Sequence, residues 1–291
     1  MIGAAQNGPL VTLWGTRGSI ATPGSDTAHY GGNTACVEVC YREKRIILDA
    51  GTGIRELGKQ IPQTDGHNEF HLFLSHTHWD HIQGFPFFLP AYNPANTIHF
   101  YGSHNKEAKL EKILTGQMHQ SYFPVQMQDL PAQMYFHELT DQPLIIGDLQ
   151  IQAQEQVYHP GGSLRFRVSA GKATVVYASD VEIDGICEAA PNTPEARQFA
   201  AYCRFIANAD LLIADAQYTR EDYATRKGWG HSSFETVIET ATRAGVKHLA
   251  MFHHDPDNTD NIINEFEQYY ASTAPDIAVF WAREGTTIPL A

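Results

Sequence analysis

The chain has 291 residues, of which 43% are hydrophobic, and its formal net charge is −13. That charge argues against long-range attraction to nucleic acid or to anionic membranes, although bound cations would leave an anionic substrate acceptable at a local site. No apolar stretch reaches the roughly 18 residues that a membrane span requires. Residues 1–9 lack a basic region followed by a long apolar run, so no signal peptide is predicted and a cytoplasmic location is expected. The four cysteines form no Cys-x-x-Cys pair and are expected to be reduced thiols.

The first two thirds of the chain are predicted to consist mainly of strands. These are short apolar runs bounded by Gly, Pro or Asn. We expect strands at 10–14, 35–41, 44–48, 70–74 and 97–101, a short helix at 105–114, and further strands at 149–158, 164–169 and 173–178. No repeat, low-complexity tract or flexible linker interrupts the pattern, so residues 1–291 are interpreted as a single domain.

The last third alternates helices with strands. A helix from about 193 to 208 is predicted because its Thr-Pro-Glu start offers an N-cap followed by proline at the first helical position. Ser232 and Glu235 are interpreted as a capping box that begins the next helix. A final helix at 260–270 is expected to bury Ile262, Ile263, Phe266 and Tyr269, and strands are expected at 210–214, 247–252 and 277–282. Strands first and strand–helix units later favour an α/β (α+β) fold of two sheets with helices outside.

The most informative segment is 75–81, Ser-His-Thr-His-Trp-Asp-His. It places three imidazoles and one carboxylate within six consecutive positions, and these groups suit zinc, iron or manganese. The apolar run at 70–74 indicates a buried strand immediately before it, so the polar side chains lie on the turn that leaves the strand. The segment therefore predicts a metal site, with a polar surface loop as the alternative.

More residues of the same chemical types follow other predicted strands. They are His159, Asp180, Asp215 and the His-His-Asp run at 253–255. Any one of them alone would be interpreted as a polar residue that faces water at a strand end. Together with segment 75–81 they indicate a common rim of the sheets, where ligands and catalytic groups converge.

These motifs resemble those of the metallo-β-lactamase fold hydrolases. The resemblance rests on His-x-His-x-Asp-His at 76–81, followed in order by His159, Asp180 and His253, and on Leu-Asp-Ala-Gly-Thr-Gly at 48–53. It covers most of the chain, from Leu-Trp-Gly at 13–15 to the closing strands. It implies a four-layer αββα sandwich with two divalent metal ions, of which zinc is the first choice and manganese or iron the alternatives.

The resemblance also assigns the metal ligands by position. One ion would be bound by His76, His78 and His159, the other by Asp80, His81 and His253, and Asp180 would bridge the two. His254 is an alternative to His253. We prefer His253 because the ligand of the similar motif follows its strand directly.

Asp180 after Val-Val-Tyr-Ala-Ser, together with Gly-His-Ser-Ser at 230–233, resembles the phosphodiesterase branch of the superfamily. That branch includes tRNase Z, the PhnP-like cyclic phosphodiesterases and bacterial cyclic-nucleotide phosphodiesterases. Its motif histidine protonates the leaving oxygen. The resemblance implies Asp80, His231 and Asp215 as the catalytic residues, with Asp215 either orienting His231 or supporting the metal ligands from behind. The alternative for His231 is a residue at the start of a helix beside a capping serine.

The resemblance further implies a small substrate. Arg17 and Asn33, in glycine-rich turns, and Ser163 and His254 are the candidate substrate contacts, with ordinary turn chemistry as the alternative. Segment 102–147 lacks the Gly- and Lys-rich arm usual in tRNA processing, and the acidic balance disfavours nucleic acid as a partner. We therefore predict a dimetal hydrolase of a cyclic nucleotide or cyclic phosphate. A 3′-end tRNA nuclease and a diiron redox protein are the alternatives, and the branch commonly forms homodimers.

Overall fold

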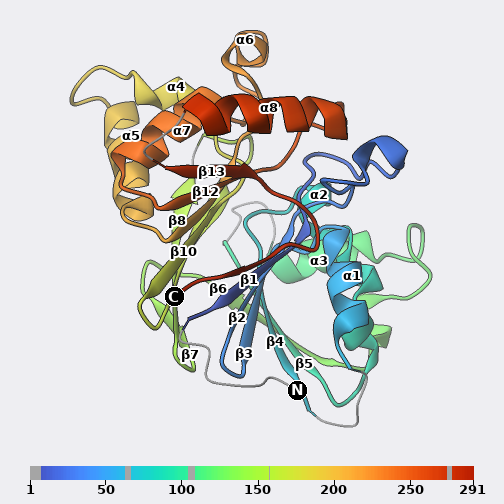
Figure 1. Cartoon of the computed structure of the whole chain (residues 1–291). Coiled ribbons are helices and arrows are strands. Elements are labelled where there is room, and N and C mark those ends of the chain that lie inside the picture. The colour runs from blue at the N-terminus through green and yellow to red at the C-terminus, as the bar shows by residue number, and fades with distance from the viewer. Residues whose placement is uncertain (1–7, 63–66, 104–108, 157, 274–276) are drawn as a thin grey trace.

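Two seven-stranded sheets face each other in the computed structural model, and helices cover their outer faces (Figure 1). The structure describes residues 8–62, 67–103, 109–156, 158–273 and 277–291. This is the four-layer αββα arrangement that the sequence predicted. Residues 1–7, which contain most of the segment on which the signal-peptide prediction rests, and 105–108 of the helix expected at 105–114 lie outside the described residues.

The first sheet comes from the first half of the chain and one closing strand. In sheet order its members are β14 (Thr287–Pro289), β1 (Leu10–Gly15), β2 (Cys36–Tyr41), β3 (Lys44–Leu48), β4 (Glu69–Phe73), β5 (Thr97–Gly102) and β6 (Gln133–Glu138). β3, β4, β5 and β6 are parallel. The carboxyl ends of β3 and β4 therefore lie at one edge, which puts Asp49 beside segment 75–81. Strands β6 and β14 were not predicted.

The second sheet has the same size and supplies the other half of the rim. Its order is β13 (Ala278–Trp281), β12 (His248–Phe252), β11 (Leu211–Asp215), β10 (Ala173–Ala178), β9 (Ser163–Ala170), β8 (Leu149–Gln156) and β7 (Leu144–Ile146). β10, β11, β12 and β13 are parallel. Parallel pairing makes these strands end at one edge, so Asp180, Asp215 and His253 come together although they are far apart in sequence.

The described residues form helices of very different lengths. They are α1 (Gly53–Gln60), α2 (Trp79–Ile82), α3 (Leu110–Gln117), α4 (Asp184–Cys187), α5 (Pro194–Ile206), α6 (Arg220–Tyr223), α7 (Phe234–Arg243) and α8 (Asp260–Thr273). α1 and α3 pack on the first sheet, whereas α5, α7 and α8 pack on the second (Figure 1). α1, α2, α4 and α6 were not predicted. In the described parts of the chain, no helix has both the length and the apolar character needed to cross a membrane.

Helix α7 begins one residue later than the predicted capping box. Its N-cap is Ser233, whose hydroxyl accepts the N–H three residues further on. Ser232 instead bonds back to the backbone of loop 181–183. The carboxylate of Glu235 accepts the hydroxyl of Tyr270 rather than closing the box. Tertiary partners thus replace the local ones that the motif would have used.

The prediction that Tyr269 is buried in α8 is wrong. Tyr269 is 62% exposed, and Tyr270 is the buried aromatic residue. Ile263 and Tyr270 are separated by seven positions, which is about two turns of helix, so they lie on the same face. Tyr269 is rotated away from that face towards solvent.

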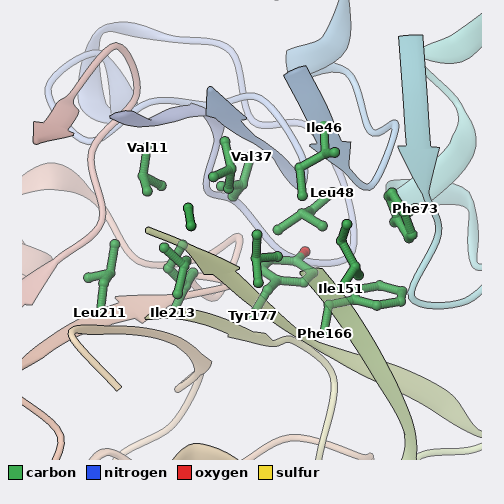
Figure 2. Packing of buried hydrophobic residues seen from close by; sticks show 14 of the residues in the cluster. Val11, Val37, Ile46, Leu48, Phe73, Ile151, Phe166, Tyr177, Leu211 and Ile213 are labelled. Carbon is green, nitrogen blue, oxygen red and sulfur yellow. The ribbon is translucent and has the colours of Figure 1, made fainter. Parts of the chain in front are cut away.

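The space between the sheets is filled by apolar side chains from both, as Figure 2 shows. Val11, Val37, Ile46, Leu48 and Phe73 from the first sheet meet Ile151, Phe166, Tyr177, Leu211 and Ile213 from the second. Each such side chain stabilises the fold by about 1.5–3 kcal/mol relative to the exposed state. This close-packed layer holds the strand ends in position. The four cysteines are free, as expected.

Candidate metal centre

Three residues of the rim leave their strands with a left-handed backbone. Asp49 (φ 62°), Asp180 (φ 53°) and His253 (φ 62°) follow the ends of β3, β10 and β12. A positive φ is uncommon for residues other than glycine and costs on the order of 1–3 kcal/mol. Strain of this kind, repeated around one rim, points to a functional site.

The first group of side chains contains His76, His78, His159 and Asp180. One ligand-type atom from each lies within 4.8 Å of all the others. Nε2 of His159 lies 3.1 Å from Nδ1 of His78. Oδ2 of Asp180 lies 3.6 Å from Nε2 of His76 and 3.9 Å from Nε2 of His159. Nε2 of His76 and Nε2 of His159 therefore face one oxygen of this carboxylate, and His78 lies beside His159.

The second group contains Asp80, His81, Asp180 and His253, again with ligand-type atoms within 4.8 Å of one another. Oδ1 of Asp180 lies 3.2 Å from Nε2 of His81 and 3.3 Å from Nε2 of His253. Oδ2 of Asp80 is 3.2 Å and 3.1 Å from the same two nitrogens. The two oxygens of Asp180 thus face different groups, which is the geometry of a bridging carboxylate.

The donor set fits two divalent cations. Nε2 of His76 is buried and has no hydrogen-bond partner among the described residues, so its lone pair is available to an ion. Burial lowers the pKa values of His76, His78 and His159, which keeps these imidazoles neutral. Burial alone would raise the pKa of Asp180, but the neighbouring His253 and His81 hold it well below its usual range. The neutral imidazoles of the first group and the ionised carboxylate of Asp180 suit zinc, manganese or iron.

Asp49 supports the second group from behind. It is fully buried, and its Oδ2 lies 2.7 Å from Nδ1 of His81. The same oxygen accepts the hydroxyls of Tyr177 (2.6 Å) and Ser75 (2.8 Å), while Oδ1 accepts the amide of Ser75 (2.7 Å). The bond to Nδ1 fixes the ring of His81 and leaves Nε2 directed at the other ligand candidates.

His231 and Asp215 form a pair beside the same cavity. Nδ1 of His231 lies 2.6 Å from Oδ2 of Asp215, which leaves the other ring nitrogen for the cavity. Burial would lower the pKa of His231, but the charge of Asp215 and this hydrogen bond raise it to about 9. The cavity has a volume of about 480 Å³ and is lined by Ser19, His78, Trp79, Asp80, Asp180, His231 and His253.

Arg17 and His254 do not line this cavity. The guanidinium of Arg17 is fully buried and donates to the carbonyls of Gly31, Asp255 and Asn258. The ring of His254 donates from Nε2 to the carbonyl of Ala282 at 2.7 Å. Both side chains hold loops together in the structure, and their predicted contact with substrate stays a prediction. His253 is the member of the pair that joins the ligand candidates.

Asn33 and Ser163 are also absent from the lining. The amide of Asn33 donates to Glu284, and the hydroxyl of Ser163 donates to the carbonyl of Asp180 at 2.8 Å. Ser163 thus shapes the loop that carries Asp180, and Asn33 has a structural partner. Their predicted contact with substrate stays a prediction.

The sequence analysis did not assign Gly18, Ser19 or Trp79 to the site. Ser19 (φ 63°) lines the cavity, and its amide donates to Oδ2 of Asp80 at 2.8 Å. A Cβ on Gly18 would lie 2.4 Å from Nδ1 of His253, so only glycine lets this loop pass the ring. The available signals were the glycine-rich turn after Arg17 and the position of Trp79 inside the histidine motif.

Comparison with known protein families identifies the superfamily to which the chain belongs. A family described as "Beta-lactamase superfamily domain" matches residues 44–254, which include all seven ligand candidates. The chain belongs to this superfamily. The two facing sheets with helices outside them are those of a metallo-β-lactamase fold.

Individual members of the superfamily are distant but similar over most of their length. Ribonuclease Z of Porphyromonas gingivalis is 24% identical over 263 residues, covering 78% of this chain and 84% of the relative. The metallo-β-lactamase fold protein YhfI from Bacillus subtilis superposes with a TM-score of 0.68, 20% identity, and coverage of 97% and 99%. A diphosphatase from the PhnP family gives 0.69 with 17% identity, and coverage of 97% and 98%. The predicted superfamily is confirmed, and the phosphodiesterase branch stays a prediction from the sequence.

Replacing Asp49 by Asn should weaken metal binding. The substitution preserves the shape but removes the negative charge that orients His81, and loss of such a supporting group lowers metal affinity about 10- to 100-fold. Zinc or manganese bound per chain, measured by mass spectrometry and titration calorimetry, reports the effect. Asp148→Asn on the exposed surface serves as the control. Equal affinities in the two variants would contradict the supporting role of Asp49.

Gly18→Ala should disturb the second group, because the new methyl would overlap the ring of His253. Overpacking of this kind costs about 1–3 kcal/mol and would displace either the ring or the loop. We expect a lower unfolding temperature and reduced metal content. Gly24→Ala is the matched control, since a Cβ there meets nothing within 4 Å. Unchanged metal content and stability in Gly18→Ala would show that a methyl group fits between the loop and the ring of His253, which would contradict this prediction.

Proposed function

We propose that this chain, a metal-dependent phosphoric diester hydrolase of the metallo-β-lactamase superfamily, hydrolyses a small phosphodiester, a cyclic nucleotide or another cyclic phosphate. The observation that carries the proposal is the carboxylate of Asp180, which faces two groups of imidazoles, one with each oxygen, in a cavity that also contains His231. The ions would be held by His76, His78, His159, Asp80, His81, His253 and Asp180, with zinc the first choice and manganese or iron the alternatives.

Two divalent cations held by the two groups would supply Lewis-acid polarisation of a phosphoryl oxygen and would make hydroxide available at neutral pH. The protein's own residues supply orientation and proton transfer. Ser19 and the rings of His81 and His253 hold Asp80 in place. His231, held by Asp215, donates a proton to the departing oxygen, because an alkoxide is a poor leaving group.

The charges around the cavity support a small substrate. Its seven lining residues include no Lys or Arg, and the whole chain carries a net charge of −13. Binding a polyanion requires several cationic contacts to its phosphates. A single phosphodiester can instead rely on bound cations and His231.

A 3′-end tRNA nuclease is the second candidate. It is favoured by the Ribonuclease Z relative, whose name denotes action on RNA, and opposed by the acidic cavity. A diiron redox protein of the same fold would use similar ligand types, and metal analysis with absorption spectra separates it from a zinc or manganese hydrolase. A homodimer and a cytoplasmic location stay predictions from the sequence.

The substrate class can be tested with purified protein loaded with zinc or manganese. We expect release of product from cyclic nucleotides and from bis(p-nitrophenyl) phosphate, and none of the correctly processed end from precursor tRNA. A chelator should abolish turnover, and added metal should restore it. Absence of turnover with every phosphodiester would refute the proposal, and selective cleavage of precursor tRNA would favour the second candidate.

The role of His231 can be tested through the leaving group. In His231→Gln, kcat should fall roughly 10²- to 10⁴-fold for a cyclic nucleotide, whose alkoxide needs a proton. The loss should be much smaller for bis(p-nitrophenyl) phosphate, because p-nitrophenolate leaves unprotonated. His119→Gln, at an exposed position, is the control. Equal losses on both substrates would assign His231 to binding or structure and not to proton transfer.

A further inference from the structure

The most exposed large side chain near the cavity is Trp79, which is 80% exposed. It lies between two ligand candidates, His78 and Asp80, at the first position of α2, and it lines the cavity. A tryptophan is usually largely buried because its ring carries so much apolar surface. At Trp79 that surface is left open at the entrance to the site.

Trp79 contributes little to the fold. In the described part of the chain its ring makes no contact with another aromatic ring or with a cation, and it belongs to none of the three apolar cores. Its neighbours in sequence already fix the backbone, because His78 and Asp80 point into the two ligand groups. The exposed ring therefore has a surface available to a ligand.

The other residues that line the cavity indicate which chemical group of a ligand would contact Trp79. The other six lining residues are Ser19, His78, Asp80, Asp180, His231 and His253, which are polar, and none is Lys or Arg. They can hold a phosphate only through bound cations and His231. Trp79 is the one large apolar surface of the cavity, so a flat apolar group attached to the phosphate is the part of a substrate that it can bind.

We propose that Trp79 is a stacking platform for a nucleobase, so that the enzyme acts on a nucleoside phosphodiester and not on a base-free cyclic phosphate. The inference rests on the proposed function and narrows its substrate class. Stacking of a base on an aromatic side chain tolerates different bases, since every base has a flat face. A purine offers more area than a pyrimidine, and we expect adenine to bind more tightly than uracil. The cavity, at about 480 Å³, lies within the usual range for small-ligand sites.

Binding can be measured without turnover. Zinc-loaded protein is titrated with AMP and, separately, with ribose 5-phosphate, which carries the same phosphate and sugar but no base. The wild type should bind AMP more tightly than ribose 5-phosphate. Binding of AMP should also quench the fluorescence of tryptophan. Trp79→Leu should weaken AMP binding roughly 5- to 100-fold and leave ribose 5-phosphate unchanged. Trp79→Tyr should keep most of the affinity, because it keeps an aromatic face.

Turnover provides a second measurement. For Trp79→Leu, KM should rise by a similar factor for a nucleoside 2′,3′-cyclic phosphate and stay the same for glycerol 1,2-cyclic phosphate. Trp229→Leu is the matched control: Trp229 is 60% exposed and lies next to Gly230 in the His231 motif, but it does not line the cavity.

Each outcome tests either the stacking role of Trp79 or the proposed hydrolysis of a phosphodiester. Equal binding of AMP and ribose 5-phosphate, or equal weakening of both by Trp79→Leu, overturns the stacking role. A change in oligomeric state with no change in AMP affinity does the same, because it assigns the exposed ring to contact with a second copy of the chain. Trp79-dependent AMP binding without hydrolysis of any diester leaves the stacking role in place and refutes the proposed function.

Discussion

One buried carboxylate, Asp180, must present its two oxygens to two different sets of imidazoles, and much of the structure serves that requirement. The backbone takes a left-handed conformation to turn the side chain into the rim. The hydroxyl of Ser179 donates to Oδ1 at 2.6 Å, while Ser163 donates to the carbonyl of Asp180. A carboxylate buried this deeply would be costly without opposite charge beside it. The neighbouring His253 and His81 lower the pKa of Asp180, and bound cations would add positive charge beside it.

The two sheets deliver these residues by ordinary strand geometry. Parallel pairing of β10, β11 and β12 ends three strands at one edge, and β3 with β4 does the same in the other sheet. The packed apolar layer between the sheets holds their two edges at fixed positions relative to each other. Tyr177 connects them directly, because it stands on β10 in the second sheet and donates its hydroxyl to Asp49 after β3 in the first. The scaffold and the candidate metal centre are therefore one continuous structure.

The cavity has two chemically different parts. One part is the acidic and imidazole-lined floor, where cations and His231 can act on a phosphodiester. The other is the open face of Trp79 at the entrance. The lining includes no Lys or Arg, so under the proposed function phosphate recognition and catalysis would depend on bound cations and His231. The part of a substrate beyond the phosphate has to be bound by contacts outside these polar residues. An aromatic ring such as that of Trp79 has most effect there.

The residue types of the site, their order and their positions after strands were readable from the sequence, because a metal motif and a strand end are both local patterns. The side-chain directions were not. His253 and His254 are adjacent, yet one meets Asp80 and Asp180 while the other bonds to Ala282. Arg17 was predicted to contact phosphate, but its guanidinium is buried and donates to a backbone carbonyl. Ser233 caps α7 in place of Ser232. Each of these outcomes is decided by partners from distant segments, whose positions follow from how the sheets pack and not from the neighbouring sequence.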